Sequence, residues 1–87
     1  MSSLSPTAIS IITLLNNIND LILKSNDRKS ARDVMSALKV YAKEKRFDIP
    51  EERVDQFNAI LLDSRPMTIS FLLRKMTQDI INSDKHK

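Results

Sequence analysis

The sequence contains no glycine, no cysteine and no tryptophan, and its single histidine is His86. Without cysteine there can be no disulfide, no thiolate metal site and no cysteine nucleophile. Without glycine, the phosphate-binding turns of P-loop and Rossmann proteins are not expected, because they need backbone conformations that only glycine adopts readily. One histidine beside the C-terminus argues against a Ser–His–Asp triad or a histidine-ligated metal site. These absences predict a protein that is not an enzyme and that binds no metal and no cofactor.

The composition is that of a globular chain. Of its 87 residues, 41% are hydrophobic and 29% are charged, and the formal net charge is +3. This length corresponds to one small domain or to part of a larger protein, and we expect a single helical domain over residues 1–87. No segment alternates polar and apolar residues as a strand would.

The N-terminal 23 residues are apolar enough to suggest a signal peptide or a membrane span. However, the opening Met1-Ser2-Ser3 carries no Lys or Arg. Four polar residues also interrupt the apolar run: Asn16, Asn17, Asn19 and Asp20. We therefore expect no signal peptide and no membrane span. The protein is predicted to be cytoplasmic.

Apolar residues recur at helical spacing in four segments. Ser5-Pro6 is a typical helix start, Asn26 or Asp27 can cap the next helix, and Pro50 and Pro66 suit the first turns of two more. The breaks between the segments are short, which favours antiparallel neighbours. The predicted fold is all-α, a small antiparallel four-helix bundle. Its helices span about 5–24, 28–46, 50–63 and 66–82, followed by a frayed tail at 83–87.

The apolar stripe of the first segment is wider than that of a simple amphipathic helix. Besides the regular set 8, 11, 12, 15, 18 and 22, apolar residues occupy positions 9, 14, 21 and 23. This helix is therefore either central in the bundle or covered by something outside the chain. Because the core of so short a chain is thin, a homo-oligomer with an assembly role is one open alternative.

Positive charge is concentrated in residues 24–46, which hold eight cations and three anions. A basic helix could follow a nucleic-acid backbone, or it could be a solvated face that steers an acidic partner. No series of aromatic residues is interleaved with these cations, among which only Tyr41 is aromatic, and the sequence has no glycine for a helix–turn–helix corner. The candidate nucleic-acid contacts are Arg28, Lys29, Arg32, Lys39, Lys43 and Arg46.

Other residues suggest contact with a protein. Phe71 and Ile81 lie off the predicted inner face of the last helix, so either that helix is buried on two sides or a patch is exposed. Leu23 is left over from the stripe of the first helix. Arg65, held extended by Pro66 near a helix N-terminus, is expected to pair with an acid or an anion. Phe71, Ile81, Leu23 and Arg65 are the predicted partner-binding residues.

The sequence around Arg65 also resembles a known family. The element Arg65-Pro66-Met67-Thr68-Ile69-Ser70, preceded by the Ala-Arg…Ala-Leu pattern within residues 30–45, is similar to the N-terminal helical domain of the regulatory subunits of translation initiation factor 2B. The related ribose-1,5-bisphosphate isomerases share that domain. The resemblance covers about residues 9–82.

Two departures limit what this resemblance implies. The isomerases have an Arg-Gly-Ala phosphate-binding turn where this sequence has residues 24–27, which include no glycine. Their catalytic Cys and Asp belong to a Rossmann-like domain that this sequence lacks. The resemblance therefore implies a helical domain without isomerase chemistry, which in the initiation factor subunits helps to contact a partner protein. The predicted function is a non-enzymatic protein–protein interaction module with a link to translation.

Overall fold

The computed structural model describes residues 4–85, and four helices account for most of them. The helices are α1 (Pro6–Ser25), α2 (Arg28–Glu44), α3 (Glu51–Ile60) and α4 (Pro66–Lys85). None of the described residues is in a β-strand. The predicted all-α, antiparallel four-helix bundle is confirmed.

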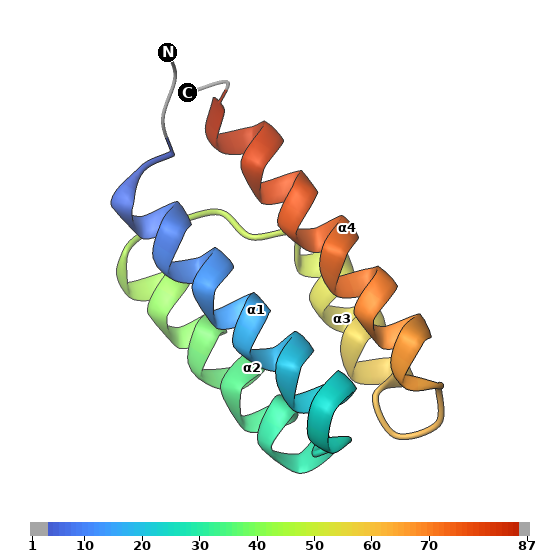
Figure 1. Cartoon of the computed structure of the whole chain (residues 1–87). Coiled ribbons are helices and arrows are strands. Elements are labelled where there is room, and N and C mark those ends of the chain that lie inside the picture. The colour runs from blue at the N-terminus through green and yellow to red at the C-terminus, as the bar shows by residue number, and fades with distance from the viewer. Residues whose placement is uncertain (1–3, 86–87) are drawn as a thin grey trace.

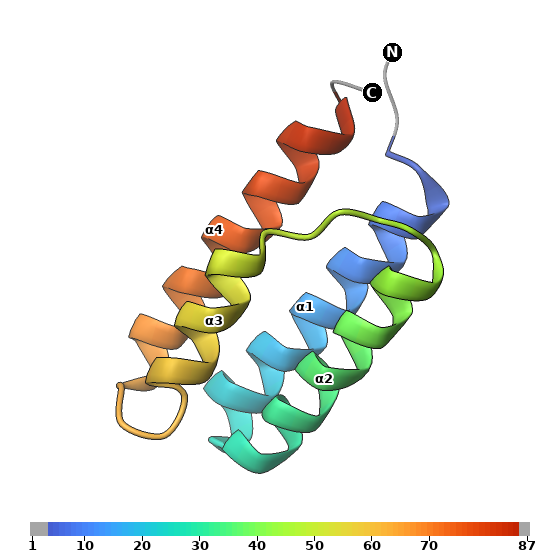
Figure 2. The same cartoon turned by 180° about the vertical axis from the view of Figure 1, so that it is seen from behind.

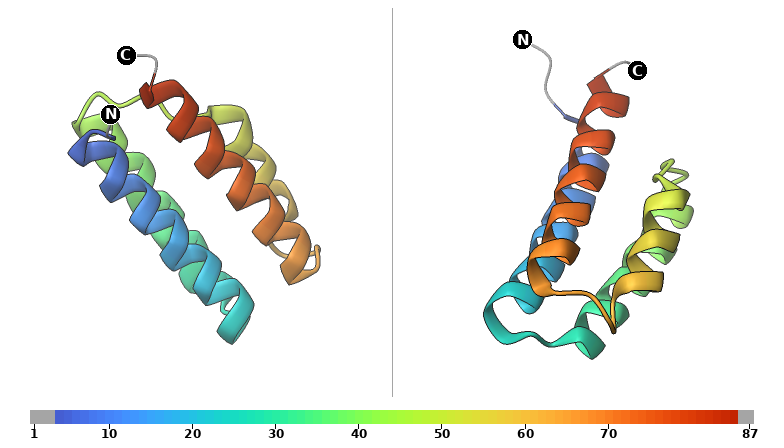
Figure 3. Two further views of the ribbon diagram at one scale, coloured as in Figure 1. Left: turned by 45° about the horizontal axis from the view of Figure 1, so that its top comes forward. Right: turned by 90° about the vertical axis from the view of Figure 1, so that its right-hand side faces the viewer.

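The bundle consists of two antiparallel helix pairs, α1–α2 and α3–α4 (Figures 1 and 3). The pairs are joined through α1, which packs on α2 and also on α4. This central position accounts for part of the wide apolar stripe of α1, since two neighbours cover two sides of it, while Ile9 and Leu23 remain exposed. The core is made by one stripe from each helix: Ala8, Ile11, Leu15, Ile18, Ile22, Ala31, Met35, Leu38, Ala42, Val54, Phe57, Leu61, Ile69, Leu72, Leu73, Met76 and Ile80.

Side chains at the helix starts act as the sequence predicts. The Ser5 hydroxyl accepts a hydrogen bond from the Ala8 N–H at 3.1 Å. The Asp27 carboxylate accepts one from the Ser30 N–H at 3.0 Å, and this bond holds the pKa of Asp27 below its ordinary value. Each of these bonds satisfies an N–H that has no partner within its own helix.

The C-terminal tail was predicted wrongly. Residues 83–85 are the last part of α4 and are not frayed, while residues 86–87 lie outside the described residues. The reason is a tertiary contact between the chain ends, because the Asp84 carboxylate accepts hydrogen bonds from the Ser5 N–H (2.8 Å) and the Ser5 hydroxyl (3.2 Å). These bonds tie the last turn of α4 to the start of α1.

Two helices end earlier than expected. We predicted that α2 would reach residue 46 and α3 residue 63, but they end at Glu44 and Ile60. At the end of α2, Arg46 adopts the left-handed conformation with φ 54°. The Phe47 N–H then bonds to the Ala42 carbonyl and the Arg46 N–H to the Lys43 carbonyl, which is a Schellman ending. At the end of α3, the Ser64 N–H bonds back to the Ile60 carbonyl and closes the turn.

The left-handed residue at the end of α2 leads to a prediction about stability. Glycine is favoured at this position, because a side chain clashes with the backbone there. We expect Arg46→Gly to raise the free energy of unfolding by about 0.5–1 kcal/mol, seen as a higher melting temperature by circular dichroism. Lys45→Gly is the matched control, because Lys45 has φ −87° and gains nothing from glycine. An Arg46→Gly variant that melts at or below the wild-type temperature would contradict this explanation.

Candidate functional site

Exposed apolar side chains gather at one end of the bundle. The structure exposes six large hydrophobic residues among those it describes, and four of them lie where α1 ends and α4 begins. Because α1 and α4 are antiparallel neighbours, these positions are at the same end of the molecule (Figure 2). We call this set the apolar end: Leu23 (43% exposed), Leu62 (64%), Met67 (69%) and Phe71 (59%).

The first two turns of α4 supply half of the apolar end. Met67 and Phe71 are four residues apart and therefore lie on the same face of the helix. That face points away from the core stripe of α4, and no other described element packs over it. The Lys75 Nζ lies 4.7 Å from the centroid of the Phe71 ring, which is a cation–π contact. Apolar surface with charge at its edge is typical of a contact site for another protein.

The edge of the apolar end carries more positive than negative charge. Lys24, Arg65 and Arg74 are exposed there, together with the exposed carboxylates of Asp20 and Asp63. Among residues 4–85 the ion pairs are Lys24–Asp20 and Arg53–Asp79, so the acid expected beside Arg65 is not found among them. Pairing of Arg65 with an anion or with an acid of a partner stays a prediction. Arg65 is exposed in the turn before α4, where it is accessible to a partner.

The structure brings together three of the four predicted partner-binding residues. Leu23, Arg65 and Phe71 are all at the apolar end, and Phe71 is exposed rather than covered by a second neighbour. The prediction for Ile81 needs correcting. It is half-buried and ten residues beyond Phe71, about 15 Å further along the axis of α4. Ile81 therefore does not belong to the same surface.

Two members of the apolar end were missed from the sequence. Met67 could have been found, because its four-residue spacing from Phe71 places both off the core stripe. Leu62 could have been found in the same way. It directly follows the inward-facing Leu61 and so lies off the core stripe of α3, and it is 64% exposed in the turn between α3 and α4.

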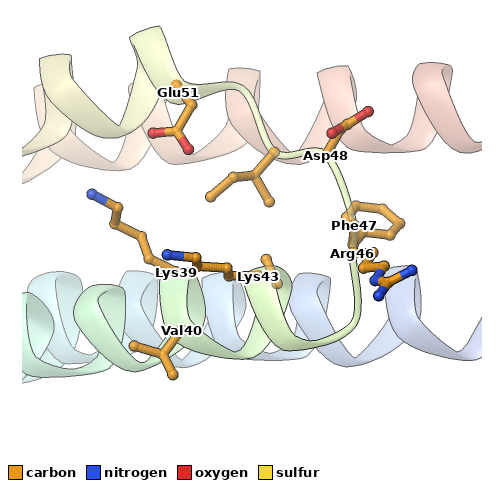
Figure 4. Close-up of a pocket in the computed structure, with 9 residues that line it drawn as sticks. Lys39, Val40, Lys43, Arg46, Phe47, Asp48 and Glu51 are labelled. Carbon is orange, nitrogen blue, oxygen red and sulfur yellow. The ribbon is translucent and has the colours of Figure 1, made fainter.

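A second feature lies at the other end of α2. An open groove of about 690 Å³ runs between the last turns of α2, the connection after it and the start of α3 (Figure 4). Three of the predicted nucleic-acid contacts, Lys39, Lys43 and Arg46, line this groove and are exposed. Lys29 and Arg32 are also exposed on α2. The basic cluster therefore does provide an accessible positive surface.

Arg28 departs from the other predicted contacts, because its side chain is used within the fold. Its Nη1 donates hydrogen bonds to the carbonyls of Leu61 (2.6 Å) and Ser64 (2.7 Å), and its Nε donates to the Asn26 side chain (3.0 Å). Leu61 is the residue at the C-terminal end of α3, where carbonyls lack partners within the helix and carry partial negative charge, and Ser64 is in the turn before α4, so the guanidinium joins these two segments. The nucleic-acid role predicted for Arg28 is therefore replaced by a structural one.

Two further observations bear on function. Among the described residues, no group of three His, Cys, Asp or Glu side chains could hold a metal ion. By length and composition, α1 is long and apolar enough to cross a membrane, even with the polar residues at 16, 17, 19 and 20. A core helix meets the same criterion, and α1 contributes Ala8, Ile11 and three further residues to the core.

Comparison of the chain with family models, with curated proteins and with solved structures finds no match.

Proposed function

We propose that this chain is a non-enzymatic protein-interaction module that contacts its partner through the apolar end. The observation that carries the proposal is the grouping of four of the six large exposed hydrophobic residues at one end of the bundle. Fully burying one such side chain is worth about 1.5–3 kcal/mol. Four together can offset a substantial part of the cost of association, which is about 4–15 kcal/mol.

The surroundings of the apolar end indicate the chemistry of the partner. Lys24, Arg65, Arg74 and Lys75 border it, against the carboxylates of Asp20 and Asp63. A complementary surface would be apolar at its centre and acidic at its edge, since opposite charges speed encounter and set the orientation. The resemblance to initiation factor 2B subunits, whose helical domain contacts a partner protein, agrees with this proposal, and a link to translation stays a prediction.

Phe71→Asp is the direct test. A carboxylate at the centre of the contact has to be desolvated, and the apolar contact is lost, so we expect the partner's affinity to fall by about thirtyfold or more. Tagged wild-type and variant proteins would be compared in capture from the native lysate, with the amount of each captured protein measured. Circular dichroism should be unchanged, because the side chain is on the surface.

Ile9→Asp is the matched control. Ile9 is a similarly exposed apolar residue near the start of α1, far from the apolar end, and its substitution should leave capture intact. A partner that binds Phe71→Asp at full strength would refute the proposed surface. If the protein instead sediments as an oligomer that Phe71→Asp dissociates, the partner is a second copy of the chain, and the assembly alternative is correct.

A further inference from the structure

A second surface of the bundle, independent of the apolar end, has the features of a peptide site. It is the groove between the last turns of α2 and the start of α3 (Figure 4). The groove exists because α2 packs mainly on α1 and α3 on α4, so the two helices that flank it have different neighbours. The six residues 45–50 connect α2 to α3 across one end of it.

One wall of the groove is positively charged. Lys39 and Lys43 are one helical turn apart on α2; Lys39 extends toward the start of α3, and Lys43 lies beside it along α2 (Figure 4). Arg46 follows in the turn that ends α2. Within residues 4–85, none of these three cations is in an ion pair. Their charges are therefore available to a ligand.

The groove also has two carboxylates and an apolar part. Glu51 is across from the two lysines, but it is in the first turn of α3, where the helix dipole partly offsets its charge. The Asp48 carboxylate points away from Lys39 and Lys43 (Figure 4). Val40, Phe47 and Ile49 supply the apolar lining. Phe47 and Ile49 also pack partly against the core, which holds the connection in place.

We propose that this groove binds an acidic peptide segment of a partner protein, with its carboxylates on Lys39, Lys43 and Arg46 and an apolar side chain on the lining. Charge complementarity with the α2 wall identifies the occupant. A nucleic acid fits less well, because single strands are usually stacked base by base on several aromatic side chains, and the one aromatic residue that lines the groove is the half-buried Phe47.

The test is a fluorescence anisotropy titration of the whole chain with a labelled 12-residue peptide of Glu and Leu at helical spacing. The same peptide with Gln in place of Glu is the charge control, and single-stranded and duplex oligonucleotides are the nucleic-acid controls. We expect the Glu peptide to bind, and the variant Lys39→Gln/Lys43→Gln to lose affinity at least tenfold. The variant Lys29→Gln/Arg32→Gln, with the same change in net charge on exposed residues of α2 outside the groove, should bind as the wild type does.

Backbone chemical shifts locate the bound peptide. Residues 39–51 should shift on binding, and the apolar end should not. The proposal is overturned if the Glu peptide does not bind, if the Gln peptide binds equally well, or if the shifts lie elsewhere. It is also overturned if only the oligonucleotides bind, which would assign the groove to nucleic acid. Loss of peptide binding in Lys39→Gln/Lys43→Gln with partner capture retained would separate this site from the apolar end.

Discussion

Replacing Phe57 by alanine should lower the free energy of unfolding by about 3–5 kcal/mol, the largest effect expected of any substitution considered for this protein. Phe57 is fully buried on α3 and is the largest fully buried side chain described. A chain of this length has only about 4–13 kcal/mol of stability in total. The variant should therefore melt far below the wild type or be largely unfolded at room temperature, as followed by circular dichroism and urea titration.

The effect is expected to be large because α3 depends on packing. It has only 10 residues, and isolated helices of that length are marginal in water. Val54, Phe57 and Leu61 hold it against the rest of the bundle. Asn58→Ala, at the adjacent exposed position, is the control and should change stability by no more than about 0.5 kcal/mol. A loss below about 1 kcal/mol for Phe57→Ala would show that α3 is not anchored as described.

The second large effect is expected at Arg28. Its guanidinium connects the start of α2 to the turn between α3 and α4 through the carbonyls of Leu61 and Ser64. Arg28→Ala leaves both part-buried carbonyls without this donor. We expect a loss of about 2–3 kcal/mol in the free energy of unfolding, because hydrogen bonds to charged groups are among the stronger ones.

Lys29→Ala is the control for Arg28. Lys29 is the next residue along the chain, it is exposed, and its removal should leave the melting temperature nearly unchanged. Arg28→Lys should recover only part of the loss, since an ammonium lacks the planar set of donors of a guanidinium. If Arg28→Ala unfolds at the same urea concentration as the wild type, the two carbonyl contacts contribute nothing to stability.

Arg28 also shows why a charged residue is difficult to assign from sequence. In the sequence it is one of eight cations in residues 24–46, and it occupies the first turn of α2, where the helix dipole disfavours a cation. What makes it favourable is the C-terminal end of α3, more than 30 residues away. A sequence pattern covers only neighbouring residues and cannot show a contact across such a separation. The sequence therefore did not reveal that Arg28 is structural while Lys43 is exposed.

In the candidate sites, too, the sequence predicts some features and the packing of the helices decides others. Phe71 and Leu23 could be selected because each departs from the apolar period of its helix, a property that depends only on the sequence. Whether such a residue is exposed depends on which neighbours cover that side. Phe71 proved to be 59% exposed, whereas Ile81, selected by the same reasoning, is half-buried. The groove beside α2 has no sequence signal, because it arises from the separate packing of two helices.

The sequence by itself determined the helices, their starts and the core stripes. These depend on side-chain period and on contacts within a few residues, such as Ser5 with Ala8 and Asp27 with Ser30. The tertiary structure alone decided the central position of α1, the role of Arg28, the bond between Ser5 and Asp84, and which apolar residues remain exposed. Each of these features depends on groups that are far apart in the chain. Such groups come close together only when the helices pack into the bundle.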